Sequence, residues 1–318
     1  MAKTFAFVFP GQGSQSVGML DAWGDHPAVR ETLAEASDAL HEDVGALIAA
    51  GPKEALALTT NTQPVMLVAG VAAWRAWRAE GGALPAALAG HSLGEYSALV
   101  ASGVLTLAQA APLVRLRAAA MQEAVPVGAG AMAAILGLSA DQVVAGCAQA
   151  QASFGAGNPE VAEAVNFNDP GQTVIAGTKA GVDKACEVLK GLGAKRALPL
   201  PVSAPFHSSL MRPAAEKLQA ALAGVALAAP TIPVLNNVDV AVQDMPDAIR
   251  DALVRQAWQP VRWVECVRAL KERFGVTHIV ECGPGKALAG MTKRIDPELV
   301  GASLYDPATL ADTQELLA

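Results

Sequence analysis

Short apolar runs that end in glycine alternate along the chain with stretches of helical pattern. Three junctions of this kind are clear: TFAFVF before PGQG, ALAG before HSLGE, and THIVECG before PGKALAG. Strands that alternate with helices predict an α/β domain with a largely parallel sheet, in which the carboxyl ends of the strands carry the ligand site. We therefore expect all three junctions to lie at one edge of the sheet.

Residues 129–202 have a different pattern. Strands are predicted over GAMAAILG, VAEAVNFN, QTVIAGT and KRALPLPVS, and helices over SADQVVAGCAQAQA, opened by Ser139, and KAGVDKACEVLKGLG. This β-α-β-β-α-β order is ferredoxin-like. We expect residues 129–202 to form a compact inserted lobe and residues 1–128 and 203–318 to form the catalytic domain, with the active cleft between them.

Composition and charge narrow the class of protein. The chain has 318 residues, only 17% of them charged, and a net charge of −7, which is typical of a compact globular protein and disfavours nucleic-acid binding. The apolar run near residues 64–74 is shorter than the ~20 residues of a membrane span, and FAFVF is too short for a signal peptide. We expect a cytoplasmic monomer with no membrane or nucleic-acid partner.

The stretch LAGHSLGEYSALVASG places a serine between two glycines at a predicted strand-to-helix junction. Gly90-His91-Ser92-Leu93-Gly94 matches GxSxG, the nucleophile elbow, in which a strained turn exposes the serine hydroxyl. The alternative is a tight turn that happens to contain a hydroxyl. An apolar strand before the motif and an amphipathic run after it favour the elbow, so Ser92 is the candidate nucleophile.

A second glycine-containing loop, FPGQGSQ, follows the first predicted strand. It does not match a nucleotide-binding loop, because Ser16 stands where GxGxxG requires glycine and no GK[ST] follows. A hydrolase-type oxyanion hole takes one amide from the residue after the nucleophile and one from another strand-end loop. The N–H groups of Leu93 and Gln12 are the candidates.

The general base must come from five histidines. His26 and His41 lie in polar helical surroundings, where solvation is expected. His91 precedes the serine and should point away from it, while His278 opens an apolar strand. His207, in VSAPFHSSLM after the last strand of the lobe, is placed to enter the cleft, although a histidine packed at a domain seam is the alternative.

No acid is an obvious third member of a triad. The aspartates that follow His207 lie in a polar region that we expect to be exposed; they are Asp239, Asp244, Asp247 and Asp251. A backbone carbonyl can instead accept the other ring N–H of the histidine and fix its tautomer. We expect a dyad, and the four scattered cysteines show no metal-ligand spacing, so no metal is expected.

Two arginines lie on the apolar helix predicted over TLAQAAPLVRLRAAAMQEA. Arg115 and Arg117 are two residues apart and diverge by about 200°, so only one of them can enter the cleft. The fork of a guanidinium suits a carboxylate bidentately. The pattern alone leaves the choice between the two nearly even.

Together, FVFPGQGSQ, GHSLGEYSALVASG, RLRAAAMQEAVP, NFNDPGQTVIAG, PFHSSLM and ECGPGKAL resemble the malonyl-CoA:acyl-carrier-protein transacylase family. These blocks extend from the N-terminus to about residue 295, so the resemblance covers nearly the whole chain. It implies a hydrolase-like α/β domain with an inserted ferredoxin-like lobe. It also implies serine chemistry with no metal or redox cofactor.

The resemblance assigns roles to the residues that match its motifs. Ser92 resembles the acylated nucleophile and His207, in PFHS, the general base. Gln12 and Leu93 match the oxyanion-hole amides. Gln256, in LVRQAWQPV, matches the residue whose backbone carbonyl holds the histidine, which agrees with the missing acid.

Substrate selection is also implied by resemblance. Arg117 resembles the arginine that binds the free carboxylate of malonate, which favours it over Arg115, and Gln63 is expected to line the pocket. Phe206 before the histidine resembles malonyl-selective members. Asp169 stands where serine is more familiar after NFN, and AWQP replaces a tyrosine-containing stretch.

The resemblance implies ping-pong transfer of malonyl from malonyl-CoA to acyl carrier protein, in fatty acid or stand-alone polyketide synthesis. The carrier is expected to be acidic, so a basic rim is predicted from two dibasic pairs: Lys195-Arg196 and Lys293-Arg294. The rival predictions are a serine esterase or thioesterase on the same elbow and a catalytically silent interaction module.

Overall fold

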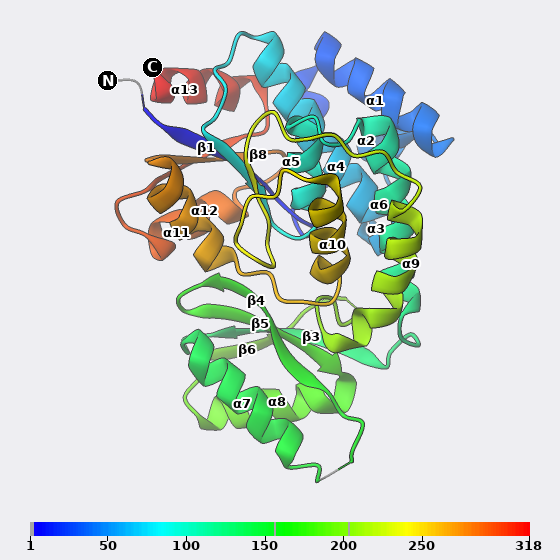
Figure 1. Ribbon diagram of the computed structural model, residues 1–318, viewed down its shortest axis with the longest axis vertical. Helices are drawn as coiled ribbons and strands as arrows, with labels where there is room; N and C mark the ends of the chain where they lie inside the picture. The colour runs from blue at the N-terminus through cyan, green and yellow to red at the C-terminus, as the bar shows by residue number, and fades with distance from the viewer. Residues whose placement is uncertain (1–2, 156, 203) are drawn as a thin grey trace.

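The chain folds around two separate β-sheets, one parallel and one antiparallel. A computed structural model describes residues 3–155, 157–202 and 204–318. Figure 1 shows the parallel sheet and its helices in the upper part of the molecule and the antiparallel sheet with two helices below. The α/β architecture with a small lobe, predicted from the alternation of apolar runs and helical stretches, is confirmed.

The parallel sheet has the strand order β7-β2-β1-β8-β9. Its strands are β1 (Phe5–Phe9), β2 (Ala87–Gly90), β7 (Val234–Leu235), β8 (His278–Cys282) and β9 (Val300–Leu304). β2 and β8 pair with β1 on either side, and Phe9 lies opposite Gly90. The three glycine-containing junctions that follow these strands therefore lie at one edge of the sheet, as predicted.

Helices cover both faces of this sheet, so its central strands are buried throughout. Those of the catalytic part are α1 (Pro27–Leu40), α2 (Val44–Ala50), α3 (Lys53–Ala57), α4 (Thr59–Ala79), α5 (Gly94–Ala101), α6 (Leu107–Glu123), α9 (Arg212–Leu222), α10 (Pro246–Gln256), α11 (Trp263–Phe274), α12 (Ala287–Ile295) and α13 (Pro307–Leu317). Two short 3-10 helices, Asp21–Trp23 and Ser209–Met211, complete it. No helix among the described residues has the length and hydrophobicity needed to cross a bilayer.

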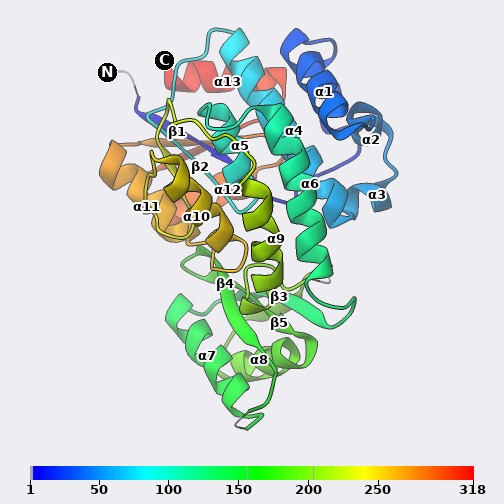
Figure 2. The same cartoon turned by 45° about the vertical axis from the view of Figure 1, so that its right-hand side comes forward.

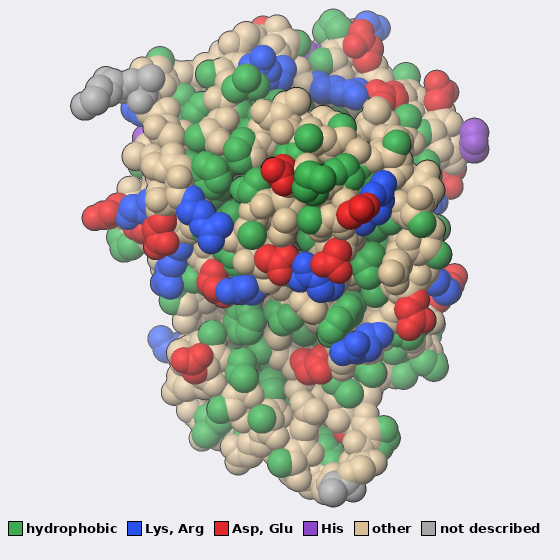
Figure 3. Space-filling view, in the orientation of Figure 1, with side chains coloured by type: hydrophobic (Ala, Val, Ile, Leu, Met, Phe, Trp, Pro, Cys, Tyr) green, Lys and Arg blue, Asp and Glu red, His purple; other side chains and the backbone are tan. Residues whose placement is uncertain are grey.

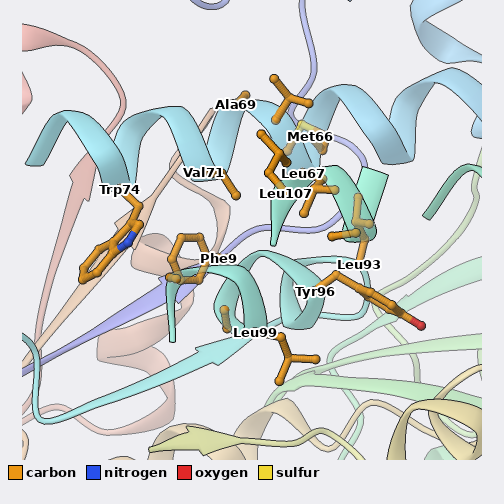
Figure 4. Close-up of a cluster of buried hydrophobic side chains, with 14 of the residues drawn as sticks. Phe9, Met66, Leu67, Ala69, Val71, Trp74, Leu93, Tyr96, Leu99 and Leu107 are labelled. Carbon is orange, nitrogen blue, oxygen red and sulfur yellow. The ribbon is translucent and has the colours of Figure 1, made fainter. Parts of the chain in front are cut away.

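The two faces of β1 have different side chains because alternate residues of a strand point in opposite directions. Phe5, Phe7 and Phe9 belong to the core that contains α4, α5 and α6, whereas Ala6 and Val8 pack in the core that contains α11 and α12. Figure 4 shows Phe9 between side chains of α4 and α5. This packing fixes the position of α5, whose first turn follows the candidate nucleophile.

The antiparallel sheet has the order β4-β5-β3-β6. Its strands and helices are β3 (Gly130–Leu136), α7 (Ala140–Ala152), β4 (Ala162–Asp169), β5 (Gln172–Thr178), α8 (Lys179–Gly191) and β6 (Arg196–Pro199). Ser139 opens α7 as predicted, through a capping box with Gln142. The ferredoxin-like element order is thus present, while the chain division at residues 129 and 202 stays a prediction.

Strand β4 joins the small sheet to the rest of the molecule. Its register against β5 is interrupted twice, and between the breaks the Phe167 N–H donates to Val261 O at 3.0 Å. The Val261 N–H donates in return to Val165 O at 2.8 Å. Figure 2 shows β3 and β4 directly below α9 and α10. This connection orients one face of the small sheet toward the edge of the parallel sheet.

Candidate active site

The turn between β2 and α5 has the geometry of a nucleophile elbow. Ser92 has a φ of 52°, in the left-handed region that residues other than glycine rarely adopt. A Cβ on Gly90 would lie 1.9 Å from the Gly94 carbonyl carbon, and a Cβ on Gly94 would lie 2.0 Å from Phe9 O. Only glycine therefore fits at either position, and the two glycines allow the tight turn that places the half-buried serine at the strand end.

The strained backbone at Ser92 predicts a stability difference between two inactive variants. Both Ser92→Ala and Ser92→Gly lose the hydroxyl, but only glycine adopts a positive φ at no steric cost. We expect Ser92→Gly to be more stable than Ser92→Ala by about 1 kcal/mol, measured by urea unfolding. A less stable glycine variant would contradict strain at this position.

Asn237 holds the elbow from the loop after β7. Its side-chain oxygen accepts from the Ser92 N–H at 2.8 Å, and its amide nitrogen donates to Gly90 O at 2.7 Å. Asn237 is fully buried. Sequence reasoning missed this residue, although its position directly after a short apolar strand, in VLNN, was a usable signal.

Ser92 and His207 form a hydrogen-bonded pair. The distance between Ser92 Oγ and His207 Nε2 is 2.6 Å, and His207 Nδ1 lies 2.8 Å from the Gln256 backbone oxygen. A carbonyl only accepts, so Nδ1 carries the proton and Nε2 is free to accept from the serine hydroxyl. Asp239 instead forms an ion pair with Arg255, and no carboxylate among the described residues contacts this imidazole.

Burial and the neighbouring charge of Arg117 lower the pKa of His207 to about 3. The imidazole is consequently neutral at pH 7. A neutral imidazole with a free Nε2 is the form that a general base requires.

The lowered pKa of His207 predicts a pH-dependent contribution to stability. Below about pH 6.5 the unfolded chain takes up a proton at this histidine and the folded chain does not, so the free energy of unfolding falls as the pH falls. Between pH 7 and pH 5 this single group should remove about 2 kcal/mol. We expect a His207→Gln variant to lose that much less stability than wild type over this interval in urea unfolding. Equal losses would contradict the lowered pKa.

Arg117 lies buried beside the nucleophile, whereas Arg115 lies on the outer face of α6. The Arg117 guanidinium donates to Gln63 Oε1 at 2.6 Å and to Ser92 Oγ at 3.2 Å. Arg115 makes a bidentate contact with Glu42 at 2.9 and 2.7 Å, near the surface. The two arginines thus diverge as helical geometry requires, and the buried one carries a charge that lacks a carboxylate partner among the described residues.

These groups open into one cavity of about 460 Å³ between the edge of the parallel sheet and the small lobe. Ser92, His207 and Arg117 line this cavity. So do the predicted site residues Gln12, Gln63 and Leu93, together with the polar side chain of Asn168. Apolar side chains of the small lobe, such as Met132 and Val174, form the opposite wall. The arrangement suits an acyl group that ends in an anion.

Leu93 and the loop that contains Gln12 both line the cavity. Leu93 precedes the first turn of α5, whose N-terminal amides lack carbonyl partners within the helix. The loop that contains Gln12 packs closely against the elbow at Gly11. A Cβ at this position would lie 2.8 Å from His91 O, so the approach requires glycine. Both predicted oxyanion-hole residues therefore line the same cavity as Ser92, and their role stays a prediction.

The chain resembles acyltransferases over almost its whole length. Residues 6–289 match the family model described as acyl transferase domain. The malonyl CoA-acyl carrier protein transacylase of Escherichia coli K12 is 53% identical over 313 residues, which are 98% of this chain and 99% of that one. The chain belongs to the malonyl-CoA:acyl-carrier-protein transacylase family.

Solved structures of the transacylase family have the same fold. An acyl-carrier-protein S-malonyltransferase from Burkholderia pseudomallei 1710b has 65% identity and a TM-score of 0.94, covering 98% of this chain and 99% of that one. A malonyl-transacylase in complex with a type II polyketide synthase acyl-carrier protein has 49% identity and a TM-score of 0.95, covering 99% and 100%. The resemblance stated from motifs is therefore confirmed.

Of the four residues of the predicted carrier-binding rim, Arg294 is paired with a carboxylate of the small lobe. Lys195 and Arg196 are exposed at the start of β6, and Lys293 is exposed on α12. Arg294 pairs with Asp169 of β4 at 2.8 Å, so this residue links the lobe to the catalytic part. Figure 3 shows charges of both signs across the middle of one face, above the small lobe. A carrier-binding role for the four residues stays a prediction.

Proposed function

We propose that the chain transfers a malonyl group from malonyl-CoA to the phosphopantetheine thiol of an acyl carrier protein. The observation that carries the proposal is one cavity in which Ser92 Oγ lies 2.6 Å from His207 Nε2 and 3.2 Å from a guanidinium nitrogen of Arg117. A nucleophile, its base and a cation for the acyl carboxylate are thus adjacent. The names of relatives at 43–53% identity support the same reaction.

In the first half-reaction, His207 Nε2 takes the proton of Ser92 as Oγ attacks the thioester carbonyl carbon. The N–H groups of Leu93 and Gln12 would stabilise the oxyanion. The carbon–sulfur bond then breaks, and coenzyme A leaves with the proton from His207. The product is a malonyl ester on Ser92.

The second half-reaction runs the same steps in reverse with a different thiol. The carrier thiol gives its proton to His207 and attacks the ester carbon. The bond to Ser92 Oγ breaks, and the serine recovers its proton from the histidine. The proposal assigns no metal or redox cofactor, because the side chains and amides of the chain supply each proton transfer and charge contact.

Arg117 would select the malonyl group. A buried guanidinium that pairs with the substrate carboxylate is left unpaired by an acetyl group, at a cost of a few kcal/mol. This feature disfavours the alternative of a general esterase. We assign the enzyme to fatty acid synthesis in the cytoplasm as a monomer, with a polyketide carrier as the second possibility, since a structural neighbour is bound to one.

The experiment that tests the function measures where the malonyl group goes. The enzyme is mixed with malonyl-CoA and either holo carrier protein or apo carrier protein, which lacks the thiol. We expect malonyl-carrier as the main product with the holo form and only slow release of malonate with the apo form. Equal and rapid release of malonate in both mixtures would contradict transfer and support a thioesterase.

A further inference from the structure

The side chain of Gln256 contacts both the nucleophile and the buried arginine. Its Oε1 accepts from Arg117 at 2.9 Å, and its Nε2 donates to the Ser92 carbonyl at 2.9 Å. The backbone oxygen of the same residue accepts from His207. Only the backbone contact was expected from the sequence. The side-chain amide is an additional connection between the groups of the site.

Glu95 contacts this amide from behind the site. Its Oε2 accepts from Gln256 Nε2 at 3.1 Å and from the Asn237 N–H at 2.9 Å. Glu95 is 2% exposed and does not line the cavity of the active site; it borders a separate small cavity with Leu99 and Ile249. Glu95 therefore touches neither substrate nor reacting atoms.

The two neighbours of Gln256 determine which way its amide faces. A guanidinium only donates hydrogen bonds, and the Glu95 oxygen accepts two, so the amide oxygen must face Arg117 and the amide nitrogen must face Glu95. A flipped amide would direct its N–H groups at the guanidinium and leave the Ser92 carbonyl without its donor. The acceptor at position 95 thus selects one of two orientations.

The orientation of the amide matters because Arg117 is otherwise held by few groups. Its other contacts among the described residues are with Gln63 Oε1, the Ser92 hydroxyl and the ring of Tyr96, whose centre lies 5.5 Å from the guanidinium carbon. Figure 4 shows that the Tyr96 hydroxyl points away from the apolar cluster. All of these partners are neutral. The amide therefore holds the guanidinium in place while no carboxylate of the described residues is hydrogen-bonded to it.

We propose that Glu95 and the Gln256 side chain are a positioning pair that sets the malonyl specificity of Arg117. Glu95 fixes the amide, the amide fixes the guanidinium, and the interposed amide keeps the guanidinium apart from the carboxyl group of the protein, so that it can pair with that of the substrate. The inference rests on the proposed function. A purely structural role for Glu95, in tying Asn237 to α5, is the alternative that the test must exclude.

The test compares kcat/KM for malonyl-CoA and acetyl-CoA in four variants. Glu95→Met and Gln256→Met each remove one member, and their double variant completes a cycle. We expect each single variant to lower the malonyl/acetyl ratio by about tenfold or more, mainly through KM for malonyl-CoA. The double variant should have the ratio of Gln256→Met alone, because Glu95 acts through the amide. Glu95→Gln keeps an acceptor oxygen, so its malonyl/acetyl ratio should stay within about threefold of that of wild type.

Glu281→Met is the matched control, because Glu281 is an equally buried carboxyl that instead accepts from the Ala289 N–H of α12 at 2.9 Å. It should lower stability and leave the substrate ratio unchanged. Three results would each overturn this inference and leave the proposed function standing. They are an unchanged substrate ratio in Gln256→Met, equal losses for both substrates in Glu95→Met, and additive effects in the double variant. A wild-type enzyme without malonyl preference would overturn the proposed function together with it.

Discussion

Replacing His207 by alanine is expected to slow malonylation of Ser92 by on the order of 10⁴-fold. The imidazole is the only proton acceptor among the described residues that is hydrogen-bonded to the hydroxyl, and without it the serine must ionise unaided. Rapid-quench measurement of acyl-enzyme formation gives the rate directly. The hydrogen bonds of Arg117 go to Gln63, Ser92 and Gln256 and not to His207, so binding of malonyl-CoA should be weakened much less than the chemical step.

His41→Ala is the control for His207→Ala, because His41 is exposed at the end of α1. It should retain the wild-type rate. Partial recovery of the His207→Ala enzyme by added imidazole is expected, since the vacated space borders the cavity. A His207→Ala enzyme within tenfold of wild type would contradict the assignment of this residue as the base.

Replacing Arg117 by alanine is expected to remove most of the preference for malonyl-CoA over acetyl-CoA. The guanidinium is 1% exposed and lies 3.2 Å from the nucleophile oxygen, where the carboxylate of a bound malonyl group can reach it. Loss of the ion pair between Arg117 and the substrate carboxylate should lower kcat/KM for malonyl-CoA by about 10²-fold or more. The value of kcat/KM for acetyl-CoA should change far less. Arg117→Lys keeps the charge but not the planar fork, so an intermediate ratio is expected.

Arg115→Ala provides the matched control on the same helix. Arg115 pairs with Glu42 near the surface, two residues from the buried arginine, and its loss should leave the substrate ratio as in wild type. A ratio that is unchanged in Arg117→Ala, or that changes equally in both variants, would contradict selection of the substrate carboxylate by Arg117.

The sequence predicted those features that follow from local pattern. Apolar runs ended by glycine located β1, β2 and β8, and the change in pattern after residue 129 located the second sheet. The GxSxG motif, with an apolar strand before it and an amphipathic run after it, predicted the elbow, and only glycines fit on both sides of Ser92. The motifs of the family then singled out Arg117, a choice that helical geometry left open.

Contacts between distant segments were not predictable from local pattern. Glu95 is one charged residue on an apolar helix, and nothing in GEYSALVA indicates that it meets Gln256, 161 residues further along the chain. The same holds for Asp169, whose ion pair with Arg294 of α12 joins two segments 125 residues apart in the sequence. Tertiary packing determines these partners, so only the structure reveals them.

The central claim is that the hydroxyl of Ser92 carries the malonyl group between the two thiols. Intact-mass spectrometry with peptide mapping, after the enzyme is mixed with malonyl-CoA alone, tests this claim most directly. We expect one malonyl group per chain, located on the peptide that contains Ser92, absent from Ser92→Ala and lost when holo carrier protein is added. An unmodified wild-type chain, or a malonyl group on another residue, would contradict the account.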